Sequence, residues 1–183
     1  LQWAVNCSDG KELDEFDNDK TNYIFGVKDN MIICGTRMID MKHKNMLNSA
    51  FSSFFHDVVI PEGNFIESTR FFVDKERTQS LLGRRFPVTL ALFLSLINYA
   101  RQHGYDGILA VSSHPMLHII KSSGWNVTQL KTGMSEKNEP VHLLLGHVDR
   151  QSQEALKNRI FKKLNTQDEH MLNAWPLSDE PAF

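Results

Sequence analysis

The sequence predicts an α/β (α+β) fold, a three-layer sandwich in which a mixed central sheet is flanked by helices. Three observations lead to this prediction. β-type runs fill the first half of the chain, a long helical pattern follows them, and further strands then alternate with a second helix. Strands and helices in this order bury their apolar faces best as packed layers.

The first half reads as a β-meander. Two β-type runs lie near residues 22–28 and 31–40, and the Asp29-Asn30 pair between them is typical of a hairpin turn. A third run, over 64–73, is rich in Thr, Phe and Val and is predicted as a strand. Between the second and third runs, aromatic residues recur at spacings of three and four within 50–58. This spacing favours a short helical or looped lid.

The second half begins with the clearest helix, Phe86 to Gly104, whose apolar residues nearly encircle it and predict burial. Pro87 suits its first turn, and Gly104 marks its end. The later elements are predicted as a strand over 105–113, a helix ending at Gly124, strands in "WNVTQL" and "PVHLLLGHV", and a modest amphipathic helix after Asp149.

Length and charge define the class of protein. The 183 residues suit one domain over 1–148, with a C-terminal helix and tail over 149–183 that packs on it or extends from it. A formal net charge of -2 gives no global nucleic-acid footprint. No apolar run approaches the ~18 residues of a membrane span, and no signal peptide is visible. The two cysteines suggest no disulfide framework, so we expect a reduced, cytoplasmic setting.

Several common site motifs are missing. Neither a P-loop nor a dinucleotide-binding glycine pattern is present, and no HExxH or GxSxG occurs. His114 and His118 are four apart on a predicted helix, but caps or surface positions are better interpretations than metal binding, and we predict no metal site. Cys34 lies in an apolar strand and is expected in the core rather than as a nucleophile.

A set of charged residues remains. Arg37 interrupts an apolar strand, and an Arg among buried neighbours needs a carboxylate partner. Pairing of strands 31–40 and 64–73 would bring Arg37 near Glu67 and Arg70. Asp14 and Asp17 are three residues apart and share a face if their loop is locally helical.

Glu67 and Arg70 pose a geometric problem. Residues three apart point to opposite faces of a regular strand. If both side chains serve one site, the strand must carry a bulge or a sharp twist, which we predict near Ser68-Thr69.

The motifs together carry a family resemblance. Trp3, "LDEFD" (13–17), "CGTRMI" (34–39) and "ESTRFFVDK" (67–75) occur in an order that resembles the LuxI-type acyl-homoserine lactone synthases. The segments "LLGRRFPVTLALFLSLINYA", "MLHIIKSSGW" and "HLLL" are also similar, so the resemblance runs from Leu1 to about Val148. The family has residues before this tryptophan that are absent here, so we expect the numbering to start inside the domain.

The resemblance implies a fold and a reaction. The fold is GNAT-like, and the substrates are S-adenosylmethionine and an acyl chain on acyl carrier protein. The amine of S-adenosylmethionine attacks the acyl thioester, and the methionyl carboxylate then displaces methylthioadenosine and closes the lactone, a quorum-sensing signal. No metal or redox cofactor is implied.

The resemblance also assigns roles to residues. Glu67 is the candidate base, because the ammonium must lose a proton before it attacks. Asp14 and Asp17 are assigned to recognition of the amine and the sulfonium. Arg37 and Arg70 bind the substrate carboxylate or hold the aspartates in place. Trp3 is expected near the S-adenosylmethionine pocket.

Two further groups of residues concern the acyl donor. Many 3-oxoacyl-specific relatives have threonine at the position of Ala110, where a hydroxyl could bond a 3-oxo group. Alanine cannot make this hydrogen bond, so it favours an unsubstituted chain or relaxed choice at C3. One hydrogen bond shifts this preference by only ~0.5–1.5 kcal/mol. A basic surface should face acidic acyl carrier protein. The predicted acyl-chain residues are Phe71, Leu92, Leu96, Ala110, Ser112, Met116 and Leu117, and the predicted docking residues are Arg84, Arg85, Lys121 and Lys131.

Two alternative functions stay open. One is a GNAT-fold N-acyltransferase that uses acyl-CoA, although such enzymes usually have a Q/R-x-x-G-x-G/A loop and this chain has only Gly83 in "TQSLLGRRFPV". The other is a catalytically silent relative that binds S-adenosylmethionine or acyl carriers. Lactone and methylthioadenosine among the products would separate the synthase from both.

Overall fold

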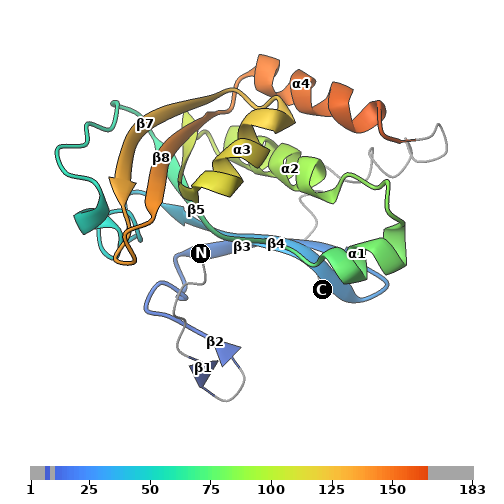
Figure 1. Cartoon of the computed structure of the whole chain (residues 1–183), viewed down its shortest axis with the longest axis horizontal. Helices are drawn as coiled ribbons and strands as arrows, with labels where there is room; N and C mark the ends of the chain where they lie inside the picture. The colour runs from blue at the N-terminus through green and yellow to red at the C-terminus, as the bar shows by residue number, and fades with distance from the viewer. Residues whose placement is uncertain (1–6, 9–10, 165–183) are drawn as a thin grey trace.

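A mixed six-stranded sheet forms the centre of the protein in the computed structural model, which describes residues 7–8 and 11–164 (Figure 1). The strand order is β3-β4-β5-β6-β8-β7, and every neighbouring pair is antiparallel except β5–β6. The layered α/β prediction is therefore confirmed. The strands of this sheet are β3 (Thr21–Lys28), β4 (Met31–Asp40), β5 (Phe65–Val73), β6 (Gly107–Ser113), β7 (Val127–Met134) and β8 (Pro140–His147).

The helices lie mainly over one face of this sheet (Figure 1). They are α1 (Lys75–Leu82), α2 (Val88–Gln102), α3 (His114–Ser123) and α4 (Arg150–Phe161), with one 3₁₀ turn, η1 (Ser52–Phe54). A separate two-stranded ladder pairs β1 (Cys7–Ser8) with β2 (Lys11–Glu12). None of the described helices is long and apolar enough to cross a membrane.

The β3–β4 hairpin is confirmed where the sequence predicts it. Asp29 and Asn30 have φ values of 50° and 61°. Two consecutive positive φ values define the turn whose twist matches that of paired strands, and short polar residues tolerate them. This turn joins β3 to β4, and in their ladder Arg37 of β4 pairs with Tyr23 of β3.

The predicted bulge is present in β5, slightly further along than Ser68-Thr69. Pairing passes from Arg37↔Thr69 directly to Gly35↔Phe72, so Thr36 faces two residues, Arg70 and Phe71. Arg70 has a φ of 51°, a left-handed conformation that lets the extra residue leave the ladder. The bulge therefore changes which face the following side chains reach.

The helical region after β5 contains one more helix than the sequence predicted. Asp74 caps α1 by accepting a hydrogen bond from the backbone N–H of Arg77 at 2.9 Å. Gly83 then ends α1 with a φ of 80°. The long predicted helix is confirmed as α2, which is buried on most of its faces.

Strands β5 and β6 diverge at the centre of the sheet. They pair in parallel over only three residues, ending at Glu67↔Leu109. Beyond this point β5 continues beside β4, and β6 continues beside β8. The divergence leaves a gap between two central strands, which is where the main cavity of the protein opens.

Two apolar cores cover the two sides of the sheet. The larger one lies under α2, α3 and α4 and includes Phe93, Ile97 and Leu156. The smaller one is formed by the segment over 41–60 against β6 and β8, where Phe51, Phe54 and Phe55 are buried. The aromatic cluster predicted as a lid is thus a looped core element with a single 3₁₀ turn. The helix predicted after Asp149 packs on α2, and the tail beyond residue 164 lies outside the described residues.

Candidate functional site

The main cavity has a volume of about 1170 Å³ and lies between the diverging strands β5 and β6. One end carries charged side chains from the loop before β3 and from β4 and β5. The other end is lined mainly by apolar side chains from α2, β6, α3 and β8. A single cavity therefore joins a charged wall to an apolar chamber.

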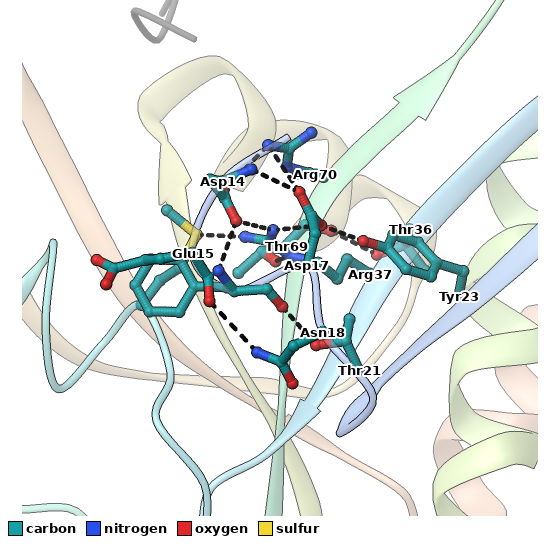
Figure 2. Close-up of polar contacts among 12 residues, drawn as sticks. Asp14, Glu15, Asp17, Asn18, Thr21, Tyr23, Thr36, Arg37, Thr69 and Arg70 are labelled. Atoms are coloured by element: carbon teal, nitrogen blue, oxygen red, sulfur yellow. Dashed lines mark hydrogen bonds and ion pairs between the residues drawn. The ribbon is translucent and has the colours of Figure 1, made fainter. Parts of the chain in front are cut away.

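The charged wall consists of two aspartates and two arginines that bond to one another (Figure 2). Arg37 Nη1 lies 2.7 Å from Asp14 Oδ1 and 2.9 Å from Asp17 Oδ1. Arg70 Nη2 lies 3.0 Å from Asp14 Oδ2 and 3.5 Å from Asp17 Oδ2. The prediction that Arg37 has carboxylate partners is confirmed, and the formal charges of the four residues cancel.

Arg37 is the buried member of this cluster, with no exposed surface. Its Nε donates to Thr69 Oγ1 at 3.0 Å, and its Nη2 contacts Met46 Sδ at 2.9 Å. The guanidinium also lies over the Phe16 ring, 5.6 Å from its centroid. These contacts and the two aspartates surround Arg37, which also belongs to the cavity lining.

A tight turn brings the two aspartates together. The backbone N–H of Asp17 donates to the carbonyl of Asp14 at 3.1 Å, and that of Asp14 donates to Asp17 Oδ2 at 2.8 Å. Asp14 lines the cavity and its side chain is 29% exposed, whereas that of Asp17 is 7% exposed and also accepts from the Tyr23 hydroxyl. Asp14 is thus the outer carboxylate and Asp17 the inner one.

The pKa values of both aspartates are lowered. Burial opposes this effect, but hydrogen bonds from Arg37 and Arg70 outweigh it and lower the pKa of Asp14. For Asp17, burial is likewise outweighed, by hydrogen bonds from Tyr23, the Asp14 backbone and Arg37, and its pKa falls to about 2. Both side chains therefore stay negatively charged at neutral pH.

Arg70 is the outer cation of the wall. It lines the cavity, and its side chain is 26% exposed. The bulge in β5 places it on the same side of the strand as Thr69 and Glu67. Its guanidinium is thus accessible from the cavity while it contacts Asp14.

Glu67 lies behind the wall and does not line the cavity. It is 1% exposed, and its two carboxylate oxygens accept hydrogen bonds from the backbone N–H groups of Met46 at 2.9 Å and Leu47 at 2.7 Å. Burial raises the pKa of Glu67, although these two hydrogen bonds and the charge of Arg37 oppose the shift. Among the carboxylates of the site, Glu67 is the one with the higher proton affinity.

The apolar chamber contains most of the residues predicted for it. Phe71, Leu96, Ala110, Ser112 and Met116 line the cavity. Leu92 and Leu117 do not; both are buried in the larger core. The chamber also contains residues that the sequence did not single out: Phe93, Ile120, Trp125, Val127, Leu144 and Gly146.

The four predicted docking residues do not form one patch. Arg84 and Arg85 are exposed between α1 and α2, and Lys121 is exposed on α3. Lys131 lies on the edge strand β7, far from the α1–α2 connection (Figure 1). The structure instead places Arg84 in a second groove, of about 790 Å³, with Lys75, Arg159, Lys162 and Lys163.

This basic groove has two further features. No carboxylate occurs among the described residues that line it. The N-terminus of α2 faces it without a side-chain cap, and Thr78 Oγ1 is buried there with no hydrogen-bond partner. Helix N-termini and unpaired donors favour anions. Sequence reasoning missed this groove because its residues come from α1, the α1–α2 connection and α4.

Some predicted residues carry no site chemistry or fall outside the described ranges. Trp3 lies outside the described residues. Cys34 is buried in the core, and burial raises its pKa to about 11, as expected for a structural thiol. Within residues 7–8 and 11–164, no group of three or more His, Cys, Asp or Glu side chains is placed to hold a metal ion.

Comparisons with known proteins agree with this geometry. The family model described as autoinducer synthase matches residues 1–156. An acyl-homoserine-lactone synthase of Pectobacterium carotovorum subsp. carotovorum is 49% identical over 177 residues, which cover 97% of this chain and 82% of that protein. One of Dickeya dadantii (strain 3937) is 49% identical over 171 residues, or 93% of this chain and 81% of that protein.

Solved structures show the same fold. The AHL synthase LasI matches with a TM-score of 0.75 at 22% identity, covering 85% of this chain and 79% of LasI. BjaI, a CoA-dependent acyl-homoserine lactone synthase whose structure holds SAM and isopentyl-CoA, matches with a TM-score of 0.74 at 21% identity. This match covers 86% of this chain and 72% of BjaI.

Proposed function

The chain belongs to the autoinducer synthase family and is an acyltransferase of the acyl-homoserine-lactone synthase type, and on that premise we propose how its cavity performs the reaction. S-adenosylmethionine binds at the charged wall, and an acyl chain carried as a thioester on acyl carrier protein fills the apolar chamber. The observation that carries this proposal is the single cavity joining both regions between β5 and β6. Such a cavity presents a cationic amine to an acyl group.

The charged wall fits the polar groups of S-adenosylmethionine. Arg70, the outer cation, binds the methionyl carboxylate by charge-assisted hydrogen bonds. Asp14, the outer anion, contacts the ammonium or the sulfonium. Arg37 and Asp17 lie deeper and fix these two side chains, because a bonded cluster holds its outer members in place without reorganisation.

The reaction then proceeds in two steps. The substrate ammonium loses a proton, and its nitrogen attacks the thioester carbon, so a C–N bond forms, the C–S bond breaks and the carrier thiol leaves with a proton. The methionyl carboxylate oxygen next attacks its own γ-carbon. A C–O bond forms, the sulfonium C–S bond breaks, and methylthioadenosine leaves as a neutral thioether.

Glu67 is our candidate for the proton acceptor. Its raised pKa gives it a higher proton affinity than Asp14 and Asp17, whose pKa values are lowered. Because Glu67 does not line the cavity, the proton reaches it through water. The same carboxylate anchors Met46 and Leu47, so its substitution tests two roles at once.

The experiment on Glu67 separates these roles by pH. Glu67→Gln keeps one acceptor oxygen for the loop but removes the base, so we expect kcat to fall more than tenfold and the acid limb of the pH–kcat profile to disappear. Affinity for S-adenosylmethionine should change little. An unchanged pH profile would leave Glu67 with the anchoring role alone.

The choice of acyl carrier protein over coenzyme A rests on the basic groove. Five Lys and Arg side chains line it, and the carrier is an acidic protein. The uncapped N-terminus of α2 and Thr78 offer hydrogen bonds to the phosphate of the carrier's prosthetic arm. Coenzyme A also carries phosphates, so the two donors differ mainly in the contacts made by the carrier's surface.

The decisive experiment compares the two donors at one chain length. Purified protein is incubated with S-adenosylmethionine and either acyl carrier protein or coenzyme A bearing the same acyl group, and lactone and methylthioadenosine are measured by mass spectrometry. We expect a higher kcat/KM with the carrier protein. Turnover by coenzyme A alone would overturn the donor proposal, and no lactone from either donor would overturn the synthase proposal.

A charge reversal on α4 tests the groove itself. Lys162 lies in the groove at the C-cap of α4, whereas Lys157 lies on α4 itself, outside the groove lining. Lys162→Glu should raise the KM for the carrier protein several-fold and leave the KM for coenzyme A less affected. Equal effects of the two substitutions would show general electrostatics rather than docking at the groove.

A further inference from the structure

The apolar chamber contains a polar group that the proposed reaction does not use. The Oγ atom of Ser112 is buried and makes no hydrogen bond to any described residue. Ser112 as a whole is only 6% exposed, and it lines the cavity. A buried hydroxyl without a partner destabilises a protein. Such a group needs an explanation, and a ligand that enters the cavity provides one.

The strand geometry places this hydroxyl beside the acyl chain. Ser112 and Ala110 are two residues apart on β6, so their side chains share a face. Ala110 pairs with Leu144, and Met116 follows on α3; all three also line the cavity. The Ser112 hydroxyl is therefore a polar atom next to apolar cavity-lining side chains.

The one polar neighbour across the sheet is already engaged. Ser112 pairs with His142 of β8. The His142 ring contacts His114 Nδ1 through Nε2 at 3.3 Å and Thr132 Oγ1 through Nδ1 at 3.2 Å. Because both ring nitrogens have partners, His142 does not bond the Ser112 hydroxyl, and that hydroxyl is available to a ligand.

From these observations we propose that Ser112 is a specificity-determining residue that recognises an oxygen substituent on the acyl chain, so that the enzyme takes a 3-oxo or 3-hydroxy acyl group. The inference rests on the proposed synthase function. A serine hydroxyl donates to a ketone and can also accept from an alcohol. An unsubstituted chain would leave the hydroxyl unpaired, which disfavours that substrate. Ala110 alone favours an unsubstituted chain, and Ser112 supplies the hydroxyl that Ala110 lacks.

A pair of substitutions of equal shape tests this role. Ser112→Thr keeps a hydroxyl, whereas Ser112→Val replaces it with a methyl group of the same size. The enzyme is given equimolar unsubstituted, 3-oxo and 3-hydroxy acyl carrier proteins of one chain length, and the lactones are quantified by mass spectrometry. We expect the wild type to favour an oxygenated chain and Ser112→Val to shift the ratio toward the unsubstituted chain by about two- to tenfold. Ser112→Thr should retain the wild-type preference.

A measurement without substrate provides a second readout. Ser95 is a matched control, because it is buried on α2 outside the cavity lining and its hydroxyl donates to the Ala91 carbonyl at 3.0 Å. Ser112→Ala removes an unpaired hydroxyl and should keep or raise the melting temperature. Ser95→Ala removes a bonded one and should lower the melting temperature, with no change in the lactone ratio.

The possible failures are distinguishable. If the wild type makes no lactone from any donor, the proposed function fails. If lactones form but Ser112→Val leaves their ratio unchanged, or if the wild type prefers the unsubstituted chain, the assignment of Ser112 is wrong while the synthase function stands.

Discussion

The two ends of the cavity differ in how their polar groups are bonded. At the charged wall, Arg37 donates to two aspartates and a threonine, and its surroundings hold it rigidly. In the apolar chamber, the Ser112 hydroxyl has no hydrogen-bond partner among the residues that the structure describes. The wall is organised before substrate arrives, whereas the chamber keeps one hydrogen bond for its ligand. This difference supports our proposal that the wall determines the chemistry and the chamber selects the chain.

The variant with the largest expected effect removes the Arg37 guanidinium from the charged wall. Arg37→Met keeps a long side chain but leaves the buried Asp17 carboxylate only its longer contact with Arg70, at 3.5 Å. Because removing one partner of a buried ion pair is costly, the free energy of unfolding should fall by about 3–5 kcal/mol. Guanidinium-induced unfolding measures this change.

The control for Arg37→Met is Lys157→Met on the surface of α4. Lys157 lies 3.5 Å from Glu154 in an exposed pair, and its loss should cost less than about 1 kcal/mol. If both variants were equally stable, the wall would not be the rigid region described above.

A variant with a smaller expected effect adds a methyl group inside the apolar chamber. A Cβ atom at Gly146 would lie 2.5 Å from Trp125 Cζ2. Trp125 cannot easily retreat, because its Nε1 donates to the His147 carbonyl at 2.8 Å. Gly146→Ala should therefore lower the free energy of unfolding by about 1–3 kcal/mol.

The same variant should change the product. Both Gly146 and Trp125 line the chamber, so the added methyl group reduces the room for the acyl chain. Lactone profiles from mixed acyl donors should shift toward shorter chains. A profile that keeps its chain lengths would show that this part of the chamber does not contact the acyl chain.

The smallest expected effect concerns acid stability. The pKa of Asp17 is about 2 in the folded protein, below its ordinary value, so the unfolded chain binds its proton more tightly. The stability from Asp17 is present above the ordinary aspartate pKa, near 4, and is lost as the pH falls toward 2. Asp17→Asn removes this term, so unfolding free energies measured between pH 4 and pH 2 should show a shallower slope. Parallel slopes in the variant and the wild type would contradict the pKa shift.

The sequence predicted those features that depend on local pattern. The hairpin turn at Asp29-Asn30, the buried helix α2 and the need of Arg37 for carboxylates all follow from residue type and spacing. The pairing of Arg37 with aspartates in the charged wall was predictable because an arginine buried in an apolar strand needs carboxylate partners.

Other features depend on pairings between distant segments. The bulge falls at Arg70 because one residue of β4, Thr36, faces two residues of β5, and composition does not reveal that count. Glu67 is enclosed by backbone N–H groups of a loop twenty residues away, so its absence from the cavity lining was not visible in its motif. The basic groove combines α1 with α4, two helices far apart in the sequence.

The bulge at Arg70 divides β5 into two halves of opposite phase. Before it, Ile66 faces the core under the helices while Glu67 and Thr69 face the site; after it, Phe71 and Val73 take over the core side. Deleting one residue at this point would shift the alternation of side chains along the rest of the strand by one position. Every position up to Val73 would exchange inside for outside, although no apolar residue would be lost. The spacing of Glu67 and Arg70 in this chain is therefore tied to the geometry of the strand.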